Sequence, residues 1–377
     1  MELLSITLSI TRFGNWSAKG ADVDTSGTPT IYDVAKIAGV SANTVSRVLN
    51  GKEGVGDETR ARILQIMRDV DYHPHVGARA MRGRRAGCIG LTLTAPLDVV
   101  PVSQPMFLWL FNELYRVFGS TGERVCFDLN PFEQSPTGDY ARSIWDNLYS
   151  VCVLAGPLAV NDTIVERIHR TGIPYLALGQ LDRFPECSCA TVDYENGAYL
   201  STKFLLDRGH TRIAMLKALS DFQPGVERRR GYVRALEEAG IDLDDRLIRS
   251  VSFGASNIVN VVHRLLNDSD VTALVDCSAT EDASGIREGA RRAGRVPGQD
   301  FEIVVWTYTN DAVVLPEACA HVWLPVLESA SEGLELLADW HHGKREGPIQ
   351  LVYAPTMYES PKGHEIAAPH RLFDSLQ

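Results

Sequence analysis

The chain has 377 residues, of which 45% are hydrophobic and 23% charged, so it is long enough for two or three globular domains. This composition excludes a disordered chain, and no apolar run reaches the roughly 20 residues of a membrane-spanning helix. The seven cysteines are scattered, which favours reduced thiols, and no Cys or His cluster has the spacing of a metal site. We therefore expect a cytoplasmic protein with no membrane contact, no cofactor and no metal.

The net charge of −11 by itself opposes binding to nucleic acid. The charge is uneven, however. Residues 28–87 hold ten Lys or Arg against six Asp or Glu, so this segment carries +4 and the remainder −15. A small basic module on an acidic body is typical of a protein in which one module alone meets DNA.

The first predicted elements are two short helices between residues 30 and 50. Thr30 is a good N-cap with Asp33 three residues later, and Ser41 caps a second helix that ends at Leu49. Gly39 stands where the chain must reverse and where positive φ suits glycine. Small and apolar residues recur at helical spacing and let the helices pack together: Val34, Ala35, Ala38, Val40, Val45, Val48 and Leu49. The pattern predicts a helix-turn-helix, although many capped helix pairs with a glycine turn do not touch nucleic acid.

A third helix is expected from Asp57 to about Val70, with apolar residues that can cover the first two. Pro74 ends this unit. The following segment, 75–87, is short, basic and interrupted by glycine, and taken alone it reads as a flexible tether. Residues 1–28 are expected to be a disordered extension.

From Cys88 onward, short β-branched runs alternate with helical stretches, which predicts parallel sheets built from βαβ units. The expected strands are CIGLTLT, RVCFDL, VCVLA, YLAL, TVD, RIAMLK, TALVD, EIVVW and HVWL. About 270 residues are too many for one such sheet and fit two lobes.

Particular segments resemble a known family. The runs YDVAKIAGVSANTVSRVLNG and VGDETRARILQIMRDVDYHPHVGARAM resemble the DNA-binding headpiece and hinge of the lactose-repressor (LacI/GalR) family. GIPYLALG, DYENGAYLSTKFLLDRGHTRIAML and ERRRGYVRALEEAG resemble its effector-binding core. The resemblance implies an all-α helix-turn-helix headpiece plus an α/β two-lobed, periplasmic-binding-protein-like domain with parallel sheets. The expected ranges are a headpiece at 29–74, a hinge at 75–87, a two-lobed effector-binding and dimerisation domain at 88–360 and a tail at 361–377. The chain is expected to cross between lobes near residue 188, to return near 320 and to cross again a few residues later.

The resemblance also implies a DNA interface on a pseudo-palindromic operator in double-stranded DNA. Ala42 and Asn43 occupy the family's main specificity positions, and the guanidinium of Arg47 suits bidentate contact with guanine. Arg79 and Met81 fall in the family's hinge helix, where Met81 replaces the usual leucine as an apolar wedge in the minor groove. The tail lacks a leucine heptad, which favours a homodimer. Residues expected at phosphates are Thr30, Tyr32, Ser46, Asn50 and Thr59.

The effector site is where the chain departs most from the family. Arg228 matches the arginine that grips effectors in much of the family. The Asn-Asp pair expected near Ser278 and Ala279 is missing, and Trp306 and Tyr308 replace a usual Gly and Asp. Both aromatic side chains could stack on a sugar ring, which favours a carbohydrate effector. The full set of expected effector contacts is Met106, Phe107, Phe222, Arg228, Ser278, Trp306 and Tyr308.

These features predict a DNA-binding transcriptional regulator, expected to be a repressor, that is controlled by a small molecule bound between two lobes. One alternative is a constitutive regulator whose cleft has lost its ligand. An enzyme is disfavoured because the chain has no dinucleotide fingerprint, P-loop or nucleophile elbow. A secreted solute-binding protein is disfavoured by the headpiece and by the lack of a signal peptide.

Overall fold

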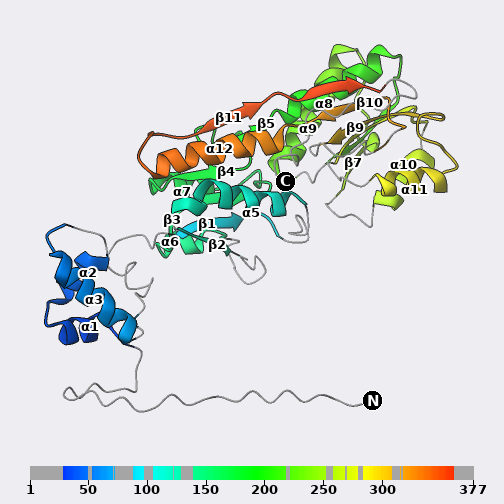
Figure 1. Ribbon diagram of the computed structural model, residues 1–377. Coiled ribbons are helices and arrows are strands. Elements are labelled where there is room, and N and C mark those ends of the chain that lie inside the picture. Colours follow the sequence, from blue (N-terminus) through cyan, green and yellow to red (C-terminus); the bar gives the residue numbers. More distant parts are fainter. Residues whose placement is uncertain are drawn as a thin grey trace, which may run out of the picture. The chain divides into compact units, whose positions relative to one another are not determined.

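The computed structural model describes most of the chain: residues 29–49, 53–70, 72, 88–96, 105–121, 123–128, 139–217, 221–251, 258–267, 270–278, 283–307, 315 and 317–360. The expected extension, the hinge and the tail lie outside the described residues, as do Asn50, Arg79, Met81 and Tyr308. The chain forms two compact units, Met1–Ala78 and Arg79–Gln377, which are described separately (Figure 1).

The first unit is a three-helix headpiece of α1 (Ile31–Ala38), α2 (Ala42–Leu49) and α3 (Asp57–Asp69). Thr30 and Asp33 form the predicted capping box, Gly39 has φ 65°, and Ser41 Oγ accepts a hydrogen bond from Thr44 N at 3.1 Å. These features set the start and end of α1 and the start of α2, as the sequence predicts. The fully or nearly buried core consists of Val34, Ala35, Ala38, Val45, Val48 and Ile63.

The second unit contains a first lobe built on a six-stranded sheet in the order β11-β5-β4-β3-β1-β2. All its strand pairs are parallel. The strands are β1 (Cys88–Leu93), β2 (Arg124–Asp128), β3 (Tyr149–Ala155), β4 (Tyr175–Ala177), β5 (Cys189–Val192) and β11 (Gln350–Tyr353). The helices are α5 (Pro105–Phe118), α6 (Arg142–Trp145), α7 (Ile164–Arg170) and α12 (Val326–His341), with the 3-10 turn η1 (Gly119–Thr121). Apolar side chains of α5 and α12 bury one face of this sheet.

The second lobe has another six-stranded sheet, in the order β12-β10-β9-β8-β6-β7, in which only the pairing of β12 with β10 is antiparallel. Its strands are β6 (Ile213–Lys217), β7 (Ile248–Ser250), β8 (Ala273–Cys277), β9 (Glu302–Thr307), β10 (Ala320–Trp323) and β12 (Thr356–Glu359). Its helices are α8 (Tyr194–Asp207), α9 (Gln223–Glu238), α10 (Ile258–Asn267) and α11 (Ser284–Arg292), with the 3-10 turn η2 (Asp245–Leu247).

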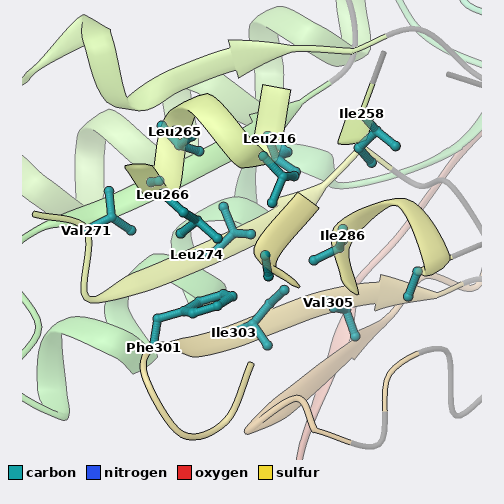
Figure 2. Close-up of a cluster of buried hydrophobic side chains, with 14 of the residues drawn as sticks. Leu216, Ile258, Leu265, Leu266, Val271, Leu274, Ile286, Phe301, Ile303 and Val305 are labelled. Carbon is teal, nitrogen blue, oxygen red and sulfur yellow. The ribbon is translucent and has the colours of Figure 1, made fainter. Parts of the chain in front are cut away.

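Both faces of this second sheet are covered. Leu216, Leu274 and Ile303 point from neighbouring strands into a cluster with side chains of α10 and α11 (Figure 2). Alternate residues of the same strands, such as Met215 and Val275, pack on the opposite face with residues of α8 and α9. This explains why the strands read as nearly continuous apolar runs, which is typical of parallel sheets buried on both sides.

The path between the lobes corrects one prediction. The chain enters the second lobe after β5 and returns after β10, close to the positions expected. The third crossing does not follow within a few residues. Instead α12 and β11 keep the chain in the first lobe from Val326 to Tyr353. The reason is that α12 buries Leu334 and Leu337 in the first lobe's core, and β11 then pairs with β5.

All nine expected strands are present, and β7, β11 and β12 are additional. Among the described residues, no helix combines the length and the apolar character that a membrane crossing requires.

Candidate DNA interface and effector site

The outer face of α2 carries the predicted base-reading residues. Val45 and Val48 are buried in the headpiece core, and this orientation fixes the opposite side of the helix toward solvent. Asn43 and Arg47 are exposed there, and Ala42 is half-buried. An exposed amide and guanidinium on one helix face are groups that can pair with adenine or guanine edges in the major groove.

Arg47 has a contact that the sequence did not suggest. Its Nη2 donates a hydrogen bond to the backbone carbonyl of Glu53, in the loop that follows α2. The loop turns sharply here, with Gly54 at φ 90°, and a Cβ on Gly54 would lie 2.8 Å from that same nitrogen. Glycine therefore leaves room for the guanidinium, whose Nη2 already donates to the Glu53 carbonyl.

The described residues expected at phosphates lie near helix starts or on the face of α2. Tyr32, in the first turn of α1, is 70% exposed. Thr59 is half-buried in the first turn of α3, and Ser46 is half-buried on α2. The Thr30 hydroxyl is already committed to the capping box, since it donates to Asp33 Oδ2 at 2.6 Å. The positive ends of α1 and α3 suit phosphate, so the arrangement fits backbone contacts.

In the body, Arg228 on α9 combines deep burial with hydrogen-bond donors that lack a partner. Only 3% of Arg228 is exposed, and its Nε and Nη1 are buried without a hydrogen-bond partner. The guanidinium carbon lies 4.8 Å from the ring centre of Tyr194 and 5.2 Å from that of Trp306. Buried donors cost free energy unless a ligand or a water molecule accepts their hydrogen bonds. Arg228 can therefore donate hydrogen bonds to a ligand that carries acceptor atoms.

Trp306 corrects one prediction, because it offers no open face for a sugar. It is 2% exposed and belongs to the second lobe's core. Its indole Nε1 donates to Ser201 Oγ at 3.0 Å, and its ring is stacked with that of Tyr194 at an interplanar angle of 13°. Trp306 therefore forms the wall behind Arg228 and Tyr194 instead of a stacking surface.

The first-lobe contacts are likewise only partly as expected. Phe107 is fully buried in the first lobe's core, so it is a packing residue and the prediction that it touches the effector is wrong. Met106 is half-buried beside the same core. Phe222 also packs there although it precedes α9, and it forms an isolated β-bridge with Ala159. Phe222 thus lies where the two lobes touch.

Two polar side chains at the carboxyl edge of the second sheet were not predicted. Asp276 is the next-to-last residue of β8, its side chain is buried, and its Oδ1 accepts hydrogen bonds from Ser278 N at 3.1 Å and Ser278 Oγ at 2.6 Å. Burial raises the pKa of Asp276, and the hydrogen bonds from Ser278 and the positive charge of Arg228 offset only part of this rise. Lys217 is the last residue of β6 and pairs with Cys277, the residue after Asp276. Its Nζ donates a hydrogen bond to Ser250 Oγ at 3.2 Å. Burial lowers the pKa of Lys217.

The position of these groups has a simple origin. Ligands of open α/β sheets bind beyond the carboxyl ends of the strands, where side chains of successive strands meet. Lys217, Asp276 and Trp306 lie at or next to the carboxyl ends of β6, β8 and β9, and polar residues at the ends of the predicted strands are the sequence signal for this shared edge. Ser278, which was predicted as an effector contact, is held by Asp276 at this edge.

A buried carboxyl group also lies between the lobes. Glu227 accepts hydrogen bonds from Gln223 Nε2 at 3.2 Å and from Gln180 Nε2, a first-lobe side chain, at 3.4 Å. Burial raises the pKa of Glu227 to about 7, although both amides lower it. Arg230 forms ion pairs with Asp182 of the first lobe and Glu195 of the second. Polar side chains therefore join the two lobes beside Arg228.

Two family models match the chain. Residues 30–75 match the bacterial regulatory proteins of the lacI family, and residues 123–337 match the periplasmic binding proteins and sugar binding domain of the LacI family. The second match covers more than half of the 377 residues. The chain belongs to the LacI family. It is a DNA-binding transcriptional regulator with a helix-turn-helix headpiece and a two-lobed α/β body, as the sequence resemblance implied.

Individual relatives span nearly the whole chain. The HTH-type transcriptional regulator DegA of Bacillus subtilis (strain 168) is 26% identical over 330 residues, which are 87% of this chain and 96% of DegA. The structure of a complex of the regulator CelR with cellobiose is similar in fold, with a TM-score of 0.61 and 24% identity over 88% of this chain and all of that one. A lac repressor dimer bound to operator and an anti-inducer has a TM-score of 0.65 at 20% identity, covering 89% of this chain and 99% of that one.

Proposed function

We propose that this LacI-family regulator is a homodimeric repressor that binds a pseudo-palindromic operator and responds to a carbohydrate held between its lobes. The observation that carries the DNA half of the proposal is the face of α2, where Asn43 and Arg47 are exposed over a buried Val45 and Val48. One headpiece offers only Ala42, Asn43 and Arg47 as base readers, too few for a genomic site. Two headpieces on a two-fold axis would read paired half-sites.

The effector half of the proposal is supported by Arg228 and Asp276. The guanidinium supplies donors that lack a protein partner, and the carboxyl group of Asp276 supplies an acceptor at the same sheet edge. Sugar hydroxyls both donate and accept, so they complement such a pair. Asp276 offers a carboxyl group two residues before Ser278, near which the sequence lacks the family's Asn-Asp pair. The fold likeness to a CelR complex that contains cellobiose supports the same class of ligand.

Arg47→Ala tests the base-reading assignment. Loss of a bidentate guanine contact is expected to cost about 1–3 kcal/mol and to relax sequence preference at that position. The measurement is a gel mobility shift with the promoter region next to the protein's own gene and with a scrambled duplex. Arg68→Ala is the control, since it removes the same charge from an exposed residue in the last turn of α3. An unchanged ratio of operator to scrambled affinity in Arg47→Ala would contradict the assignment.

Met81→Gly tests the hinge. An apolar wedge stabilises a kinked minor groove, whereas in a simple tether the identity of this side chain would not affect operator affinity. We expect weaker operator binding in the same gel assay, with dimerisation and ligand binding of the body retained. Equal operator affinity in the variant and the parent would reduce residues 75–87 to a linker.

The alternatives give different results in these assays. An enzyme or a solute-binding protein would shift no DNA in the gel. A constitutive regulator would shift the operator, but none of a panel of mono- and disaccharides would change its operator affinity or its melting temperature.

A further inference from the structure

A second polar cluster lies at the end of α12, on the first lobe. His341 is the last residue of α12 and His342 is its C-cap. Glu123 lies directly before β2, and its Oε1 is 2.5 Å from His341 Nε2 while its Oε2 is 3.9 Å from His342 Nε2. One ligand atom from each of the three side chains lies within 4.8 Å of the other two.

This cluster is separate from the effector residues. Glu123 precedes Arg124, which pairs with Cys88 at the start of β1, so the cluster is at the amino edge of the first lobe's parallel sheet. Arg228 and Asp276 belong to the second lobe. The three side chains are 16–32% exposed, so water and ions can reach them.

We propose that Glu123, His341 and His342 form a binding site for a divalent transition-metal ion. Two imidazoles and one carboxylate are ligands that Zn²⁺, Co²⁺, Ni²⁺ and Cu²⁺ accept, whereas Mg²⁺ and Ca²⁺ prefer oxygen alone. Ligand atoms about 2.0–2.2 Å from one ion are separated by roughly 3–4 Å. Glu123 Oε1 and His341 Nε2, which are 2.5 Å apart, would therefore separate slightly as the ion enters between them, and the exposed His342 ring would turn toward it. The negative end of the α12 dipole adds attraction for a cation.

Spacing along the chain predicts no metal site, because Glu123 is 218 residues from His341 and only the fold brings the two side chains together. Adjacent histidines at a helix end are the one local signal that could have suggested the site.

The test is a Co²⁺ titration of the full chain, produced without a polyhistidine tag, stripped of metal and kept reduced. We expect one equivalent of Co²⁺ with visible d–d absorption and no thiolate charge-transfer band, and we expect Zn²⁺ to displace it. His342→Asn and Glu123→Gln should each weaken binding by at least about tenfold, because even the partners of metal ligands contribute that much. His342 is exposed, so its replacement does not disturb the core.

His210→Asn is the matched control. His210 Nε2 lies 3.2 Å from Glu302 Oε2, so this variant removes a histidine from another His–Glu pair and should leave Co²⁺ affinity unchanged. The proposal is overturned if the parent takes up no Co²⁺, if a thiolate band dominates, or if His342→Asn and Glu123→Gln bind like the parent. In those cases Glu123 and His341 form an ordinary ion pair.

Discussion

Replacing Arg228 with alanine is expected to abolish the response to the effector while operator binding persists. Each charge-assisted hydrogen bond contributes about 1.5–3 kcal/mol, so losing two should weaken sugar binding by about a hundredfold or more. Arg228 is in the second unit and the base-reading face is in the first, so the headpiece itself is unchanged. The measurements are the sugar-induced shift in melting temperature and operator affinity with and without sugar, across a panel that includes cellobiose.

Two further variants sharpen this result. Arg229→Ala is the matched control, because Arg229 is the next residue of the same helix and pairs with Asp245 at 2.9 Å. Arg228→Lys keeps the charge but not the planar fork of donors, so it should restore little of the response. A full response in Arg228→Ala would refute the assignment, whereas a parent that responds to no sugar would favour the constitutive regulator.

The second large effect is expected from Gly231→Ala, which should destabilise the two-lobed body. A Cβ on Gly231 would lie 1.9 Å from Glu195 O and 2.8 Å from Tyr199 N. These are backbone atoms of α8, so α9 would have to move away from it as a whole. Overpacking costs about 1–3 kcal/mol where side chains can yield, and a backbone clash should reach or exceed that range. Urea unfolding of the purified chain measures the loss.

Gly119→Ala is the comparison for this experiment. There a Cβ would lie 3.2 Å from the ring of Tyr115, a side chain that is 78% exposed and free to turn aside. This variant should retain nearly the full free energy of unfolding. If Gly231→Ala unfolds at the same urea concentration as Gly119→Ala and the parent, then α8 and α9 are not packed as closely as the structure shows.

The features that local sequence determines were predictable. The caps at Thr30 and Ser41, the turn at Gly39 and the apolar strands all follow from residues close together in the chain, and the structure confirms them. The choice of Arg228 came from family resemblance, and the structure adds its buried, unpartnered donors. Its role with an effector remains a prediction.

The errors share a different cause, since they depend on which segments meet in space. Phe107 and Trp306 look like ligand contacts in the sequence because large aromatic residues suit both cores and binding sites. Their burial is decided by α12 and α8, which come from other parts of the chain. Asp276 was missed because only the strand register brings the carboxyl ends of β6 and β8 to one edge of the sheet. The path through α12 and β11 could not be read from alternation of strands and helices alone.

That path determines the order in which the body can be completed on a ribosome. Most of the second lobe is contiguous, from α8 through β10, so it leaves the exit tunnel as one piece. The first lobe begins earlier but lacks α12 over its apolar face, and β5 lacks its outer neighbour, until Tyr353 has been synthesised. The lobe that is translated first is therefore finished late, and its half-built sheet keeps an open edge of the kind that nascent-chain chaperones cover.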